Sequence, residues 1–355
     1  MNSDSADVAN SVSTSSQGAL PGGDATTTTT RRHSHDAIGA AAEPVARRSR
    51  VPVIRMLWND KFAFCSVVFL IFVTCCALFG PAMLGDAATK LNLRLRNFAP
   101  FSFEHGWLYL LGADALGRSM IARLIVASQN TLIIAASAVV LSLIIGGMLG
   151  IVAGFFNGRF SNLIMRLADI IMSFPSLLIA VVILYIFEPR VANLVLVLGI
   201  TRLPIYMRTA RAEVLEIRER LFVSAARVLG ASNWRLLGRH IAPLVLPTLT
   251  TIATLEFAFV MLAESSLSFL GIGIQPPEIT WGLMVAQGRN YLQSAWWLSF
   301  FPGLMIMLTA LSLNLLSGWL RLLLDPVQRW RLEHPGGGNV PAKAANDAAE
   351  VRTRA

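Results

Sequence analysis

Long apolar runs, separated by shorter polar and basic segments, dominate the middle of the sequence. A helix needs about 20 apolar residues to cross the ~30 Å hydrocarbon core of a bilayer, and several of these runs approach or exceed that length. The expected spans are near residues 62–84, 131–156, 163–187, 191–207, 244–272 and 297–320. The sequence shows no series of ~10-residue segments of alternating hydrophobicity, which is the pattern typical of an outer-membrane barrel. The pattern therefore predicts an all-α polytopic membrane protein with six transmembrane helices.

Composition supports the membrane assignment. Of 355 residues, 54% are hydrophobic and 14% are charged, whereas soluble domains carry roughly 25% charged residues. The net charge of +9 fits basic cytoplasmic loops better than it fits a nucleic-acid partner. Cys65, Cys75 and Cys76 all fall in the first apolar run, so neither a disulfide framework nor a metal site is expected.

The two ends differ from the apolar middle. Residues 1–50 are rich in Ser, Thr, Ala and Gly and have too little apolar surface to fold, so they are predicted to be a disordered cytoplasmic tail. Residues 55–330 form the predicted transmembrane domain, and residues 331–355 a flexible C-terminal tail.

Basic residues predict the orientation. The segment between the fourth and fifth spans carries seven arginines, whereas the segments after the third and fifth spans hold one each, Arg190 and Arg289. Cytoplasmic loops carry the excess of Lys and Arg, so both termini are expected in the cytoplasm. The segment 85–130 fits this rule less well, because its five basic residues would lie outside.

Three local patterns predict contacts between helices. Gly146, Gly150 and Gly154 recur every four residues, a stripe that lets helix backbones approach closely. Pro175 is expected to kink the third span. Asp114 and Arg118 stand at i and i+4 and can form an ion pair on a short helix.

The basic segment before the fifth span reads "SAARVLGASNWRLLGRHIAPLVLP" from Ser224. Gly230 can end a first short helix in a left-handed cap, Ser232 can cap a second, and Pro243 marks the start of the span. We expect a helix–turn–helix unit outside the bilayer over residues 208–243. Its small residues and basic rim suit docking onto a cytosolic partner. An amphipathic helix on anionic lipid fits composition equally well.

This segment resembles the "EAA" loop of permease subunits of bacterial ABC importers, which docks on the ATPase subunits. The family pattern has Glu-Ala-Ala, three residues, Gly, and later Ile and Pro; Ser224 stands where its Glu is expected. The candidate docking residues are Ser224, Ala225, Ala226, Arg227, Gly230, Ile241 and Pro243.

The resemblance extends over residues 55–330. "LLGADALGRSMIARLI", "MRLADIIMSFPSLLIA", "AESSLSFLGIGIQPPEITWGLM" and "FPGLMIMLTALSLNLLSGWLRLLLDP" are similar to the second permease of dipeptide, oligopeptide and nickel importers, although Ala113 replaces a usual Thr. It implies the type I ABC importer permease fold in a bacterial inner membrane. The implied partners are a second permease, forming a heterodimer, two ATPase subunits that bind ATP and Mg²⁺, and an extracytoplasmic solute-binding protein. The chain itself would bind no cofactor.

Three acidic residues lie in or near the apolar runs: Asp169, Glu256 and Glu264. A charge within the bilayer is costly, so such residues line a pathway or form buried hydrogen bonds. Glu256 and Glu264, eight residues apart, lie near one face of a helix. Trp281, Trp296 and Trp297 fall near the expected outer boundary and are interpreted as interfacial anchors.

Other functions remain as alternatives. A secondary transporter would normally carry more spans with internal repeats. A channel or membrane enzyme is a weaker alternative, since the sequence has no H-E-x-x-H, G-x-S-x-G or P-loop motif. The favoured hypothesis is a non-catalytic permease subunit for di- or oligopeptides, with nickel as the alternative substrate.

Overall fold

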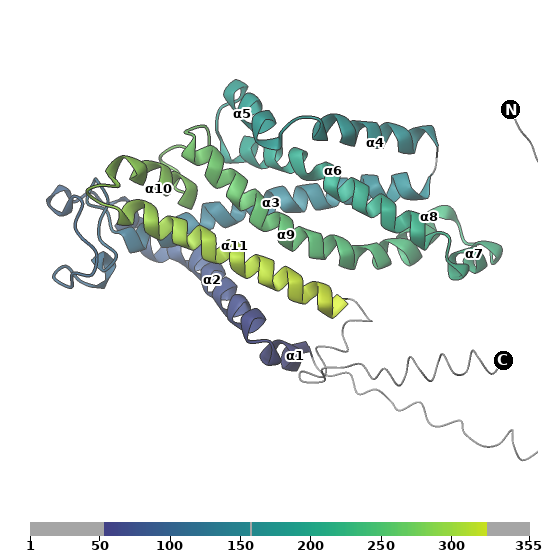
Figure 1. Ribbon diagram of the computed structural model, residues 1–355, viewed down its shortest axis with the longest axis horizontal. Helices are drawn as coiled ribbons and strands as arrows, with labels where there is room; N and C mark the ends of the chain where they lie inside the picture. The colour runs from purple at the N-terminus through teal and green to yellow at the C-terminus, as the bar shows by residue number, and fades with distance from the viewer. Residues whose placement is uncertain (1–52, 157, 325–355) are drawn as a thin grey trace, which may run out of the picture. The chain divides into compact units, whose positions relative to one another are not determined.

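The computed structural model describes residues 53–156 and 158–324, which are almost entirely helical (Figure 1). The helices are α1 (Val53–Asn59), α2 (Lys61–Thr89), α3 (Met120–Phe155), α4 (Arg159–Met172), α5 (Ser176–Ile186), α6 (Val191–Ile217), α7 (Leu221–Val228), α8 (Asn233–Arg235), α9 (Ala242–Phe269), α10 (Trp281–Gly288) and α11 (Trp297–Leu324). Short turns are η1 (Leu93–Leu95), η2 (Trp107–Tyr109), the π-helical η3 (Leu236–Ile241) and η4 (Arg289–Tyr291). In the described ranges no strand forms, only an isolated bridge between Ala113 and Ser119, so the all-α class is confirmed. The predicted tails, 1–50 and 331–355, lie outside the described residues.

Within the described ranges, five helical stretches are long and apolar enough to cross a membrane: Lys61–Thr89, Met120–Phe155, Val191–Ile217, Asn233–Phe269 and Trp297–Leu323. A sixth span results if α4 and α5 are counted together, although the two helices are bent by 83° at the break between them. Pro175 is the residue before α5 and has no N–H to continue the ladder of α4. The predicted third span is therefore a broken pair of helices.

Large apolar side chains cover the outside of the long helices. On α2, Ile71, Phe72 and Leu78 are each more than half exposed. Apolar surface of this extent on a single chain marks contact with lipid or with another subunit. Cys65 and Cys75 lie on the same exposed helix as free thiols.

Helices α3 and α6 pack closely against each other through the predicted glycine stripe. A Cβ added at Gly150 would lie 2.5 Å from the Met207 carbonyl oxygen and 2.7 Å from the Ala210 Cβ. At Gly154 it would lie 2.7 Å from the Cβ of Val214, and at Gly146 2.8 Å from a carbonyl oxygen of α6. Real Cβ atoms do not approach this closely, so each glycine is required for the two backbones to touch. The interpretation of the stripe as a helix-packing surface is confirmed.

Gly150→Ala is expected to lower the thermal stability of the solubilised protein, because the new methyl group forces α3 away from α6. Overpacking of this kind costs about 1–3 kcal/mol. Gly85→Ala in α2 is the matched control, since a Cβ there meets nothing within 4 Å. The measurement is the loss of monodisperse protein with temperature in detergent. Equal melting of the two variants would show that the α3–α6 contact does not require glycine.

Candidate functional site at the turn between α6 and α9

The short helix α7 lies at one end of the long helices α6 and α9 (Figure 1). The loop preceding it is shorter than predicted, because α6 continues to Ile217 and includes residues 208–217. Ala210, Val214 and Ile217 are all buried in the core, at the i, i+4, i+7 spacing of one helix face. This buried stripe extends α6 beyond its apolar span.

Local hydrogen bonds cap the C-terminus of α7 and the N-terminus of the helix that follows it. Gly230 has φ +84°, and the N–H groups of Gly230 and Ala231 donate to the carbonyl oxygens of Arg227 (3.0 Å) and Ala226 (3.1 Å). These bonds form a Schellman motif, which satisfies the last carbonyls of the helix. Ser232 caps the following helix, its hydroxyl accepting from the N–H of Arg235 at 3.4 Å. Both capping predictions are confirmed.

The second predicted helix does not stop before Pro243. Residues 233–269 form one continuous helical stretch, in which the π-helical turn η3 precedes the first residues of α9. A proline ring clashes with the carbonyl four residues back in a regular α-helix. The wider π turn accommodates Pro243, so the chain passes from the exposed segment into the fifth span without a break.

One face of α7 is anchored to the bundle. Val223 is 1% exposed and belongs to a core cluster with Val214 of α6 and Ile241 of η3. Ala226 is partly buried and packs against the same cluster. Ile241 was included among the docking residues in the sequence analysis. It is fully buried and packs in the same core cluster as Val223 of α7.

The opposite face of α7 is open. Leu221, Val228 and Leu229 are each 87–89% exposed. Of the predicted docking set, Ser224, Ala225, Arg227 and Gly230 are also exposed. An apolar surface this exposed, held rigidly at a helix end, is suited to a partner surface. Pro243 is exposed elsewhere, on a cavity of about 560 Å³ that it shares with Glu213 and Arg321.

Arginines surround the open face. Arg220 forms an ion pair with Glu216 at 2.8 Å. Arg227, Arg235 and Arg239 form no ion pair with any residue in the described ranges. The segment from Leu221 to Ala231, here called the docking segment, therefore combines exposed apolar groups with available positive charge.

The three predicted acidic residues lie in three different environments. Asp169 is largely exposed on α4 and forms an ion pair with Arg208 of α6. Glu256 is buried on α9, with its carboxylate 3.5 Å from the guanidinium of Arg202. Glu264 is fully buried, and its carboxylate accepts hydrogen bonds from three hydroxyl groups, two on α9 and one in the residue before α10. These are Ser268 at 2.8 Å, Ser265 at 3.4 Å and Thr280.

Sequence reasoning overlooked Arg202 as the partner of Glu256. The signal was available, because Arg202 is a full charge inside the fourth apolar run. The hydroxyl of Tyr206, one turn further along α6, is buried with no hydrogen-bond partner in the described residues. Together, Arg202, Tyr206 and Glu256 form a polar group between α6 and α9.

Two of the three predicted interfacial tryptophans are instead buried. Trp281 is fully buried, and its indole N–H donates to the carbonyl of Leu124 at 2.9 Å. Trp297 is also buried and donates to the carbonyl of Ala113 at 3.2 Å. Both indoles tie the C-terminal third of the chain to the region around the start of α3. Only Trp296 of the three is exposed, as an anchor requires.

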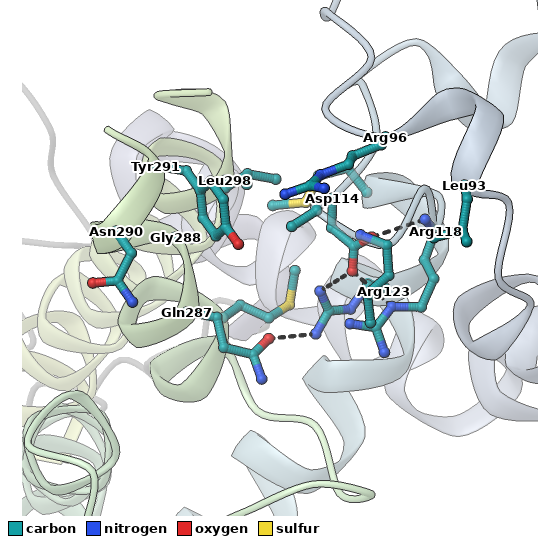
Figure 2. Close-up of a pocket in the computed structure, with 14 residues that line it drawn as sticks. Leu93, Arg96, Asp114, Arg118, Arg123, Gln287, Gly288, Asn290, Tyr291 and Leu298 are labelled. Atoms are coloured by element: carbon teal, nitrogen blue, oxygen red, sulfur yellow. Dashed lines mark hydrogen bonds and ion pairs between the residues drawn. The ribbon is translucent and has the colours of Figure 1, made fainter. Parts of the chain in front are cut away.

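The predicted ion pair of Asp114 and Arg118 is present at 2.6 Å, although it lies in a turn before α3 and not on a helix. Arg123 joins it, also at 2.6 Å (Figure 2). Arg123 further donates to Gln287 of α10 at 2.9 Å. Two of the five basic residues that fitted the orientation rule poorly are thus engaged in structural ion pairs.

Among the described residues, no group of three or more His, Cys, Asp or Glu side chains is arranged to hold a metal.

The helical bundle, its lipid-facing exterior and its exposed docking segment define a polytopic permease subunit. The family described as binding-protein-dependent transport system inner membrane component matches residues 146–330. A di/tripeptide transport system permease protein of Pseudomonas aeruginosa is 40% identical over 272 residues, covering 76% of this chain and 89% of the relative. A probable D,D-dipeptide transport system permease protein of Escherichia coli is 35% identical over 274 residues, covering 77% and 90%. A glutathione transport system permease protein of Pectobacterium atrosepticum is 34% identical over 216 residues, covering 61% and 72%.

The chain belongs to this family of inner-membrane components of binding-protein-dependent transport systems. It is a multi-pass inner-membrane permease subunit of an ABC importer, and the permease is a non-catalytic component of such a system. The secondary-transporter alternative is therefore wrong.

Val223→Asp is expected to release α7 from the bundle, because a buried carboxylate without a partner costs several kcal/mol. Local opening then exposes the peptide bonds after Arg220 and Arg227 to trypsin. We expect cleavage in the docking segment to be at least tenfold faster in the solubilised protein. Val228→Asp is the matched control, since the same change there meets water. Cleavage at the same rate in both variants would contradict the anchoring role of Val223.

Proposed function

We propose that this chain forms half of the transmembrane pathway of an ATP-driven importer of di- or oligopeptides. Support for the substrate class comes from the relatives, two of which are named for the transport of di/tripeptides and D,D-dipeptides. These names favour peptides over nickel. The other half of the pathway would come from a second, related permease, in a heterodimer.

The observation that carries the coupling mechanism is the geometry of the docking segment. Its apolar side chains point away from the bundle, while Val223 fixes it to α6. A short capped turn joins the docking segment to the continuous helical stretch Asn233–Phe269, which contains α9. A partner that grips the exposed face can therefore move a helix of the pathway. Two ATPase subunits would supply this partner surface and bind the ATP and Mg²⁺, so this chain needs no nucleotide site of its own.

Alternating access follows from these contacts. ATP binding closes the two ATPase subunits, and a docked segment that follows them biases the bundle toward one of two arrangements. An extracytoplasmic binding protein would deliver the peptide to the outward-facing arrangement. The docking segment and both termini would lie in the cytoplasm, as the concentration of arginines between α6 and α9 indicates.

Ser224 marks a departure from the docking pattern of the family. It is exposed on α7, four residues after Arg220 and three before Arg227. A glutamate at this position would have both arginines within reach on the helix surface. With serine here, Arg227 keeps its charge available for an acidic group of the ATPase.

Among the three acidic residues, we propose Glu256 as the one nearest to the pathway. Its partner, Arg202, keeps 20% of its side chain exposed, so the pair reaches the surface of the bundle. Glu264 is enclosed by hydroxyl groups and is assigned to packing between α9 and the start of α10. Asp169 is assigned to the contact between α4 and α6.

Leu229→Asp is expected to reduce recovery of the ATPase subunits with the tagged permease at least tenfold, because it places a charge in an apolar contact. Leu91→Asp is the matched control: Leu91 is also an exposed leucine, but it follows α2 at the other end of the bundle. The measurement is copurification from native membranes. Unchanged recovery with Leu229→Asp, or an equal loss with Leu91→Asp, would contradict docking at this segment.

Proteoliposomes that contain both permeases and both ATPases are expected to take up a radiolabelled dipeptide only with ATP inside and the binding protein outside. Excess unlabelled di- or tripeptide should compete with the label, whereas nickel ions should not. Glu256→Gln is expected to slow uptake severalfold, because it leaves Arg202 with an uncompensated charge. Nickel uptake without peptide uptake would overturn the proposed substrate class.

A further inference from the structure

A cavity of about 430 Å³ lies at the end of the bundle opposite the docking segment (Figures 1 and 2). One wall comes from the segment around η1 and the start of α3, and the other from α10, η4 and the start of α11. Figure 2 shows Arg96 and Arg118 on one side, facing Gln287 and Tyr291 on the other. None of Asp169, Glu256, Glu264 and the docking segment lines this cavity.

Positive charge predominates in the cavity. Arg96, Arg118 and Arg123 line it, and Asp114 is its only acidic residue. The Asp114 carboxylate is already saturated, since it accepts from the backbone N–H groups of Leu116 (2.9 Å) and Arg118 (2.8 Å) and from two guanidinium groups at 2.6 Å. Three arginines against one aspartate leave two positive charges that no residue of the cavity neutralises.

Two of these arginines have donors to spare. Arg123 is 4% exposed, and its Nε has no hydrogen-bond partner in the described residues. Arg96 forms no ion pair with any residue of the described ranges. The first turn of α3, which carries Arg123, adds the positive end of a 36-residue helix. A buried guanidinium with an unused donor favours an anion beside it.

The remaining lining combines the polar residues Gln287, Asn290 and Tyr291 with apolar side chains, and it fits a small organic ligand. Leu93, Leu116, Met284 and Leu298 face the same space. Ligand pockets are typically ~300–1,000 Å³, mostly apolar, with a few polar groups that fix the orientation. Guanidinium groups bind carboxylates through paired, charge-assisted hydrogen bonds. The lining thus matches a small molecule with one carboxylate and an apolar part.

We propose that this cavity binds the terminal carboxylate of a short peptide at the extracytoplasmic end of the permease. Arg96 and Arg123 hold the carboxylate, and the leucine and methionine side chains contact the peptide side chains. This site holds the peptide outside the membrane-spanning pathway. The substrate class and the orientation rest on the proposed function, whereas the site itself rests on the cavity and its unneutralised arginines.

The test uses the complete transporter, with both permeases and both ATPases, in lipid nanodiscs without binding protein. Saturation-transfer NMR titrations compare L-alanyl-L-alanine with its C-terminal amide, which lacks the carboxylate. We expect saturable binding of the free dipeptide and at least tenfold weaker binding of the amide. Arg96→Gln should weaken dipeptide binding about tenfold, the effect of losing a hydrogen bond to a charged group.

Arg94→Gln is the matched control, because Arg94 belongs to the same η1 turn and is exposed but does not line the cavity. Its binding of the dipeptide should equal that of the unaltered transporter. Equal binding of the dipeptide and the amide, or the same affinity in the Arg96→Gln and Arg94→Gln variants, would overturn the proposal.

Three further outcomes separate this proposal from its alternatives. If the free dipeptide does not bind and Arg96→Gln weakens only the affinity of the binding protein, the cavity receives an acidic group of that protein and the proposal is wrong. If ATP-driven peptide uptake proceeds while no dipeptide binding is detected, the carboxylate site fails and the proposed function stands. Dipeptide binding that depends on Arg96, in a transporter that imports no peptide, would keep the site and remove the proposed function.

Discussion

The backbone contact between α3 and α6 is the constraint on which the rest of the permease depends. Three glycines of α3 bring the helices so close that a single methyl group at any of them would overlap atoms of α6. Each helix then adjoins one further region of the chain at its far end. The docking segment follows the C-terminus of α6, and the arginine-lined cavity surrounds the N-terminus of α3. Because the contact is made by backbone, its geometry leaves little freedom between these two ends.

Charged side chains attach the neighbouring helices to this pair. Arg202 of α6 reaches Glu256 of α9, and Arg208 reaches Asp169 of α4. The two ion pairs differ in exposure and hence in energetic importance. The pair with Asp169 is exposed on both sides and contributes little to stability. The pair with Glu256 is largely buried, so removing one partner leaves a charge that neither lipid nor water can solvate well.

Local patterns in the sequence predicted those features that depend on a few neighbouring residues. Gly230 and Ser232 were assigned as caps because the conformations they adopt are intrinsic to glycine and serine at helix ends. The glycine stripe is likewise set by helical spacing, and the pairing of Asp114 with Arg118 by their closeness in a turn. These contacts require no knowledge of which helices are neighbours.

Features that depend on contacts distant in the sequence were missed. Trp281 resembles an interfacial anchor in sequence, but the carbonyl of Leu124, more than 150 residues away, accepts its N–H inside the bundle. Glu256 was recognised as costly, yet its partner Arg202 lies on a different span. The arginine-lined cavity also escaped prediction, because Arg96 and Gln287 come together only when α10 folds against α3. In each case the decisive fact is which helices meet.

The contacts of α9 connect the docking segment with the cavity at the opposite end. The stretch from Asn233 to Phe269 starts beside α7 and ends before α10. A Cβ added at Gly282 of α10 would lie 2.5 Å from the Cα of Ser265, and Glu264 is hydrogen-bonded across the same contact, so α10 must follow α9. Gln287 of α10 binds Arg123, which lines the cavity. Packed backbone and hydrogen bonds thus join α9, through α10, to Arg123 of the cavity. If nucleotide-driven docking shifts α9, the carboxylate affinity of the cavity must change with it, and by linkage a bound carboxylate must bias the docking equilibrium to the same extent.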